Sequence, residues 1–358
     1  MKIGIEIHQQ LATRKLFCDC PSGLSDEEAD VKLKRRLRPS QSELGEIDGA
    51  ALQEFLKGKS YLYQVQRGSS CLVDGDEEPP HMPNEEALDI ALGVALKLNA
   101  RPVDEVHFMR KIVIDGSSTY GFQRTAIVAL DGHIDIDGIR VRVPTICLEE
   151  EAARKIKGGE KETVYRLDRL GIPLIEVTTA PDITDLGQAK KTALKIGRIL
   201  REFNVNRGIG TIRQDINVSI DGGARVEIKG VQDINEISNI IKGEVKRQQN
   251  LIDVKEEIKK RGSPKIKSNI FDVSEVFSKT GSKVIAGQIG KGGKVLALGL
   301  RGFSGLLKGR LGPEFAGYAR TVAGVRGIFH SDELPAYGIS KKEVDRVSGK
   351  IKLAKEDA

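Results

Sequence analysis

Apolar and polar residues alternate strictly in several short segments, which predicts strands with one buried and one polar face. In the first of these segments, Ile3, Ile5 and Ile7 share one face, and Glu6 and His8 share the other. The same alternation recurs in residues 139–143, 212–219 and 225–229. These segments predict sheet strands that each present a row of polar side chains.

Three longer segments repeat apolar residues every three or four positions, which predicts amphipathic helices. They begin at Asn84, near Thr184 and near Glu236, and the last runs to about Lys260. Asn84 precedes two glutamates, so it can cap its helix while the glutamates face the positive end of the helix dipole. Because helices do not alternate regularly with strands, we predict an α+β fold in which helices flank a largely antiparallel sheet.

The length and amino-acid composition exclude several classes of protein. With about 150 residues per domain as a guide, 358 residues allow two or three domains. Charged residues make up 30% and hydrophobic residues 39%, which excludes a disordered chain. No apolar run reaches the ~20 residues of a membrane span, so we expect no membrane attachment. Four cysteines exclude a disulfide framework and favour a reducing cytoplasm. Aromatic residues, at 4%, are too few to predict a stacking platform for single-stranded nucleic acid.

Positive charge gathers late in the chain. Residues 263–310 hold nine Lys or Arg against two Asp or Glu, whereas the whole chain carries a formal charge of +6. The third predicted helix ends just before Gly262, Ser263 and Pro264, which are helix-breaking residues. We therefore predict two domains, residues 1–262 and 263–358. The basic surface of the second suits contact with an RNA backbone, and an ordinary solvated surface is the alternative.

The polar faces of the predicted strands carry the candidate chemistry. Carboxylates collected from several strands can hold a divalent cation such as Mg²⁺, with phosphate oxygens and water completing its coordination. A solvated strand face is the alternative for each strand taken alone. Glu176 differs because its neighbours are apolar, and a buried carboxylate needs a metal or a cationic partner. The candidates are Glu6, His8, Glu149, Glu150, Glu151, Glu176, Arg213 and Asp215.

Other motifs are incomplete. Cys18 and Cys20 form a short chelating pair, but Cys71 and His81 do not complete any standard zinc spacing, and a packed thiol pair is the alternative. Residues 287–294 are rich in Gly and Lys without the spacing of a phosphate-binding loop. No nucleophile motif of a hydrolase is present in the sequence.

Six segments, taken in order, resemble the B and E subunits of tRNA-dependent amidotransferases. They are residues 3–11, 17–21, 148–152, 168–177, 213–219 and 227–230. Residues 76–81 (DEEPPH) resemble the archaeal type of glutamyl-tRNA(Gln) amidotransferase (GatDE), in which GatE pairs with GatD. Residues after about 265 resemble the insertion domain of bacterial aspartyl-tRNA synthetases, mainly through residues 299–302 and 312–316.

The resemblance implies a reaction and its partners. ATP would phosphorylate the glutamyl side chain of Glu-tRNA(Gln), and ammonia would displace the phosphate to give Gln-tRNA(Gln). The asparaginase-like GatD would supply the ammonia, in a heterodimer or a dimer of heterodimers. The implied fold is a cradle-like sheet followed by the insertion domain. Full-length members continue beyond that domain, so we expect this chain to be a C-terminally truncated form.

The resemblance also implies roles for the candidate residues. His8, Glu150 and Glu176 would form the Mg²⁺ and active-site cluster with Glu6 beside them, and Glu149 would replace Glu150 if the strand register differed by one. Arg213 and Asp215 would line the same site, Arg213 on a phosphate. The second cysteine pair of bacterial members is missing, which argues against zinc. The alternatives are a non-catalytic tRNA-binding fragment of the family and a standalone kinase acting on a free carboxylate.

Overall fold

The computed structural model describes residues 1–39, 41, 44–265, 269–325 and 327–358, so residues 266–268 of the basic stretch lie outside it. The chain divides into two compact units. The first comprises Met1–Ser219 and Arg225–Lys242, and the second comprises Ile220–Ala224 and Gly243–Ala358. The division after residue 262 that we expected from the sequence stays a prediction.

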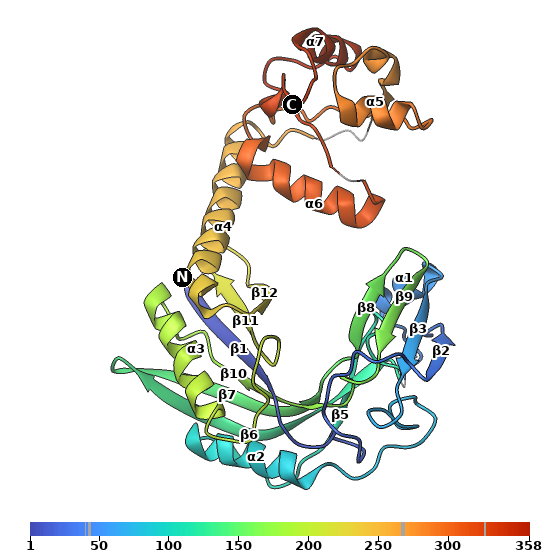
Figure 1. Ribbon diagram of the computed structural model, residues 1–358. Coiled ribbons are helices and arrows are strands. Elements are labelled where there is room, and N and C mark those ends of the chain that lie inside the picture. Colours follow the sequence, from blue (N-terminus) through green and yellow to red (C-terminus); the bar gives the residue numbers. More distant parts are fainter. Residues whose placement is uncertain (40, 42–43, 266–268, 326) are drawn as a thin grey trace. The chain divides into compact units, whose positions relative to one another are not determined.

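An eight-stranded sheet dominates the first unit, and all its strand pairs are antiparallel (Figure 1). Its order is β12-β11-β1-β10-β7-β6-β4, with β5 also paired to β6. The strands are β1 (Lys2–Gln10), β4 (Arg101–Pro102), β5 (Met109–Ile112), β6 (Phe122–Ile136), β7 (Ile139–Glu150), β10 (Pro173–Thr178), β11 (Ile212–Ser219) and β12 (Val226–Val231). A mixed α+β fold with a largely antiparallel sheet is confirmed.

Helices cover the apolar face of this sheet. The helices α2 (Glu85–Lys97) and α3 (Leu186–Leu200) lie on the same side of it and contact β1, β6 and β7 (Figure 1). Ile3, Ile5 and Ile7 are fully buried, and burying each stabilises the fold by about 1.5–3 kcal/mol. Asn84 caps α2 as predicted, because its side-chain oxygen accepts a hydrogen bond from the Ala87 N–H at 3.1 Å. The opposite face of the sheet is left for polar side chains.

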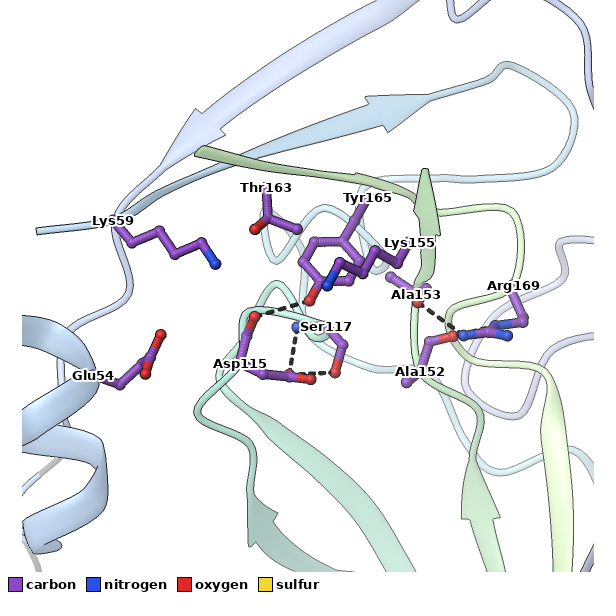
Figure 2. Close-up of a pocket in the computed structure, with 10 residues that line it drawn as sticks. All are labelled: Glu54, Lys59, Asp115, Ser117, Ala152, Ala153, Lys155, Thr163, Tyr165 and Arg169. Carbon is purple, nitrogen blue, oxygen red and sulfur yellow. Dashed lines mark hydrogen bonds between the residues drawn. The ribbon is translucent and has the colours of Figure 1, made fainter. Parts of the chain in front are cut away.

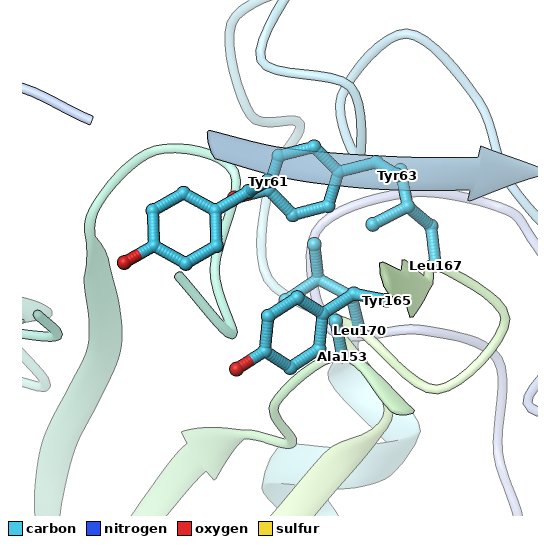
Figure 3. Close-up of a cluster of buried hydrophobic side chains, with 6 residues drawn as sticks. All are labelled: Tyr61, Tyr63, Ala153, Tyr165, Leu167 and Leu170. Atoms are coloured by element: carbon cyan, nitrogen blue, oxygen red, sulfur yellow. The ribbon is translucent and has the colours of Figure 1, made fainter. Parts of the chain in front are cut away.

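A second, four-stranded sheet of the first unit was not predicted. Its order is β2-β3-β9-β8, and β3 and β9 pair in parallel. Its elements are β2 (Val31–Arg35), β3 (Ser60–Val65), β8 (Arg154–Gly158) and β9 (Glu162–Arg166), and α1 (Gly49–Leu56) precedes β3. Three tyrosines, Tyr61, Tyr63 and Tyr165, form its core together with Ala153 and two leucines (Figure 3). The rings of Tyr63 and Tyr165 stack with their centroids 6.2 Å apart.

The second unit is built mostly from helices. Two apolar clusters hold it together, one around Phe303 and Leu306 and one around Phe277 and Ile285. Its elements are α4 (Ile237–Lys260, whose first residues belong to the first unit), α5 (Lys283–Ile289), α6 (Gly312–Ala323), α7 (Lys341–Lys350), β13 (Ile270–Asp272) and β14 (Leu296–Leu298). Its likeness to the aspartyl-tRNA synthetase insertion domain, and the cradle-like form of the first unit, stay predictions. Among the described residues, every helix is too short or too polar to span a membrane.

Candidate active site

The polar face of the large sheet brings charged side chains from neighbouring strands together. His8 on β1 lies opposite Glu176 on β10 and Arg213 on β11. Glu6, two residues earlier on β1, lies opposite Asp215 on β11. Because side chains two residues apart on a strand point to the same face, these five side chains share one surface.

Two of these residues, His8 and Glu176, form a compact and largely buried cluster with Glu149 of β7. The His8 Nε2 lies 3.1 Å from a Glu176 carboxylate oxygen. One ligand atom from each of the three lies within 4.8 Å of the other two. The exposed fraction is 7% for His8 and 2% for Glu149. Glu149 is therefore the carboxylate of β7 that lies beside His8 and Glu176.

The two carboxylates of this cluster have opposite pKa shifts. Burial, and then a hydrogen bond with Glu176, raise the pKa of Glu149 to about 9. Burial opposes ionisation of Glu176 as well, but hydrogen bonds with His8 and Glu149 outweigh it and lower the pKa of Glu176 to about 2. These opposite shifts favour a state in which the coupled pair shares one proton and one negative charge.

A second group of ligands, Glu6, His8 and Asp215, adjoins the first and shares His8 with it. Burial, followed by the charge of Glu176, raises the pKa of Glu6. Asp215 accepts hydrogen bonds from the Gly230 N–H at 2.7 Å and the Lys229 ammonium at 3.4 Å. The two groups supply four carboxylates and one imidazole.

The donor set fits a hard divalent cation. Carboxylate oxygens are the ligands that Mg²⁺ prefers, and the ion keeps coordination positions for water and phosphate. The buried Nδ1 of His8 has no hydrogen-bond partner among the described residues. A buried polar atom without a partner is costly, so an ion or water held beside His8 would stabilise this arrangement.

Glu150 lies apart from the cluster. Its carboxylate accepts two hydrogen bonds from Arg124 Nη1, at 3.0 and 3.2 Å, and a third from the Arg124 backbone N–H. The guanidinium of Arg124 in turn lies 4.1 Å from the centre of the Tyr120 ring. Burial raises the pKa of Glu150 despite the charge of Arg124. A role for Glu150 as a metal ligand stays a prediction, and Glu149 occupies the position that we expected for it.

Arg213 is already paired. Its Nη1 lies 2.8 Å and its Nη2 lies 3.3 Å from the two carboxylate oxygens of Glu151. Gln10 donates a further hydrogen bond to Glu151 at 3.1 Å. A role for Arg213 on phosphate stays a prediction, because a buried carboxylate now holds its guanidinium in the wall of the site.

Of the gathered side chains, His8, Glu149, Arg213 and Asp215 line a cavity of about 560 Å³ in the first unit. It adds two cations, Lys111 on β5 and Lys229 on β12, that the sequence analysis missed. Lys229 could have been found from the sequence, because the alternation along residues 225–229 places it on the polar face of its strand. No sequence motif marks Lys111. The charged residues lining the cavity are His8, Lys111, Glu149, Glu150, Glu151, Arg213, Asp215 and Lys229, with Asp115 at its border with a second cavity.

The cysteine pair is joined by Cys71, one of the two further residues considered from the sequence, and by Asp74. Ligand atoms of Cys18, Cys20, Cys71 and Asp74 lie within 4.8 Å of one another, whereas His81 is not part of the group. Asp74 accepts a hydrogen bond at 2.9 Å from the fully buried ammonium of Lys15. Because this carboxylate already neutralises a buried cation, a packed polar cluster accounts for the group, and we assign it no metal.

Comparison with known proteins shows which family this sequence matches. Residues 1–294 match the GatB/GatE catalytic domain family. The chain is 55% identical over 367 residues to the E subunit of glutamyl-tRNA(Gln) amidotransferase from Pyrococcus furiosus and 51% identical over 367 residues to that from Methanocaldococcus jannaschii. Each alignment covers 100% of this chain and 58% of the relative, so the chain spans little more than half the length of these proteins. On the family match and these identities, the chain belongs to the GatB/GatE catalytic domain family.

Proposed function

We propose that this chain carries the site that phosphorylates and amidates the glutamyl group of Glu-tRNA(Gln), using ATP and Mg²⁺. The observation that carries the proposal is the cluster of His8, Glu149 and Glu176, of which His8 and Glu149 line a charged cavity. Relatives named for glutamyl-tRNA(Gln) amidotransferase support this substrate. A module that only binds tRNA has no need for buried carboxylates of this kind, because uncompensated burial of charge costs stability.

The residues of the cavity and the carboxylates beside it divide into two roles. His8, Glu149 and Glu176 would hold the metal ion, with Glu6 and Asp215 on its other side. Bound Mg²⁺ neutralises negative charge on the phosphoryl group during transfer. Lys111 brings positive charge to the lining of the cavity, where it can attract the phosphates of ATP. The ammonium of Lys229 is already held by Asp215 and Glu227. The Glu151–Arg213 pair is proposed to fix the cavity wall.

The proposed chemistry needs no covalent protein intermediate. An oxygen of the glutamyl carboxylate attacks the γ-phosphorus of ATP, the bond to the β-phosphate oxygen breaks, and ADP leaves. Ammonia then attacks the carbonyl carbon of the acyl phosphate, phosphate leaves, and one proton is lost to give the amide. Positioning and electrostatics supply most of the catalysis in such transfers. We propose that an asparaginase-like protein, GatD, supplies the ammonia as part of a heterodimer.

A trapping experiment tests the proposal without GatD. The 358-residue chain is incubated with Glu-tRNA(Gln), ATP, Mg²⁺ and hydroxylamine, which attacks an acyl phosphate in place of ammonia. We expect a γ-hydroxamate on the tRNA-bound glutamate and an equal amount of ADP. Salt-sensitive binding of tRNA without hydroxamate or ADP would overturn the proposal in favour of a binding fragment.

A further inference from the structure

A second cavity of about 270 Å³ lies against strands β8 and β9 of the small sheet and the loop of Asp115 and Ser117 (Figure 2). Both cavities belong to the first unit, and they share Asp115, Ser117 and Ala152 in their linings. The two cavities are therefore neighbours. The second cavity has received no role in the proposed function.

The balance of free charge in this cavity is positive. Glu54 is neutralised by Lys57, whose Nζ lies 2.6 Å from its carboxylate. Asp115 accepts hydrogen bonds from the N–H and hydroxyl of Ser117 and keeps its negative charge, which the three cations of the lining outnumber. Across the part of the chain that the structure describes, the side-chain ammonium groups of Lys59 and Lys155 make no hydrogen bond or ion pair. Two ammonium groups are therefore available to a ligand.

A buried hydroxyl adds an independent indication. Thr163 is 1% exposed, and its Oγ1 has no hydrogen-bond partner among the described residues. It lies on β9, two residues before Tyr165, so both side chains point to the cavity face of the small sheet. Figure 2 shows the Thr163 hydroxyl and the nitrogen ends of Lys59 and Lys155 turned toward the same space. A ligand with acceptor oxygens would satisfy all three groups.

Arg169 fixes the far wall of the cavity. Its Nε donates to the Ala152 carbonyl at 2.8 Å and its Nη2 to the Ala153 carbonyl at 3.0 Å. Neutral carbonyls hold the guanidinium in place without cancelling its charge. The wall thus adds a third positive group to the two lysines.

We propose that this cavity is a phosphate subsite that takes a backbone phosphodiester of the single-stranded 3′ end of the charged tRNA. The inference rests on the proposed function, since the 3′ end must reach the neighbouring cavity to present its glutamyl group. Lysine ammoniums and a hydroxyl recognise phosphate oxygens without reading the base. The triphosphate of ATP is the other source of the same chemistry, but it is better matched to the carboxylate cluster, where Mg²⁺ can accompany it.

Matched variants of one strand test the subsite. Lys155→Met removes a cavity ammonium, and Lys157→Met removes the same charge two residues along β8, outside the cavity lining. Each variant is titrated with a 5′-labelled tRNA(Gln) transcript, intact or lacking its single-stranded 3′ end, and separately with ATP and Mg²⁺. We expect Lys155→Met to weaken binding of the intact transcript by about tenfold, the scale of one charge-assisted hydrogen bond. Binding of the shortened transcript and of ATP should not change, and Lys157→Met should leave all three unchanged.

Thr163→Val replaces the hydroxyl with a methyl group, and because Oγ1 is buried without a partner among the described residues, the variant should be at least as stable to heat as the wild type. We expect Thr163→Val to weaken binding of the intact transcript and to leave binding of the shortened transcript and of ATP unchanged. Equal effects of Lys155→Met and Lys157→Met would overturn the subsite, and so would a loss of ATP affinity in Lys155→Met, which would assign the phosphate to ATP. A wild-type chain that forms no hydroxamate, yet keeps the difference between the transcripts, would refute the proposed function and leave the RNA subsite standing.

Discussion

The ion pair between Glu151 and Arg213 allows a prediction whose size follows from the geometry. Glu151 is 2% exposed, and two nitrogens of Arg213 lie 2.8 and 3.3 Å from its oxygens. Burial opposes ionisation of Glu151, yet the charge and hydrogen bonds of Arg213 lower its pKa below the usual value. Glu151→Gln keeps the shape of the side chain and removes its charge, which leaves the guanidinium without a counter-ion.

Removing one partner of a buried ion pair costs about 3–5 kcal/mol. The side chain of Arg213 is 29% exposed, so water recovers part of this loss, and we expect Glu151→Gln to lower the free energy of unfolding by about 2–3 kcal/mol. Arg213→Met leaves the more buried carboxylate alone, and we expect about 3–4 kcal/mol. The double variant should be less destabilised than the sum of the two single variants by about 1–2 kcal/mol.

Urea denaturation of the chain at about pH 7, followed by circular dichroism, measures these differences. The control is Glu105→Gln, which removes a carboxylate paired with His107 at 78% exposure and should cost less than about 0.5 kcal/mol. A change below about 1 kcal/mol for Glu151→Gln, or strict additivity in the double variant, would refute the reasoning. Arg213 would then be free to bind a phosphate, as the family resemblance implied.

Two further predictions concern folding. Gly116 has a φ of +81°, and a Cβ at this position would lie 2.2 Å from the Tyr61 ring. Gly116→Ala should therefore lower the free energy of unfolding, measured in urea, by more than about 2 kcal/mol. Gly121 also has a positive φ but open space around its Cβ position, so Gly121→Ala is the control and should cost about 1 kcal/mol. Asp182 accepts two hydrogen bonds from the Arg142 guanidinium, first among the contacts that lower its pKa. Ionised Asp182 therefore contributes to the free energy of unfolding, by about 1 kcal/mol because Arg142 is exposed to solvent. This contribution is present above the unfolded pKa of about 3.9 and is lost as pH falls through the folded pKa. Asp182→Asn should be less stable than wild type at about pH 7, and this difference should shrink below about pH 4; a difference independent of pH would exclude the ion pair as its cause.

Local sequence signals predicted the central elements of the fold. Alternation in residues 212–219 predicted β11, and the capping side chain of Asn84 predicted the first residue of α2, because both depend on neighbours in the sequence. The small sheet could not be found in this way. Its parallel pairing joins Ser60 to Glu162, and the tyrosine core exists only once these distant segments meet (Figure 3).

In the candidate site, too, local sequence signals predicted some features, whereas others depend on how distant strands pair. Alternation placed Glu6 and His8 on one face of β1, and the structure puts both in the ligand groups. Alternation could not decide which glutamate of β7 faces them, because shifting a strand by one residue exchanges its two faces. The observed register pairs Leu174 with Glu149, which places Glu149 beside Glu176 and turns Glu150 toward Arg124.

The most direct test of the central claim is ATP cleavage by Glu149→Gln. The assay measures release of ADP in the presence of Mg²⁺ and Glu-tRNA(Gln), with tRNA affinity measured in parallel and Glu105→Gln as the control. If Glu149 helps to hold the metal ion, we predict a fall in turnover of about 100-fold or more, with tRNA affinity unchanged and the control equal to wild type. Turnover of Glu149→Gln at the wild-type rate would contradict the account and would place phosphoryl transfer elsewhere on the chain.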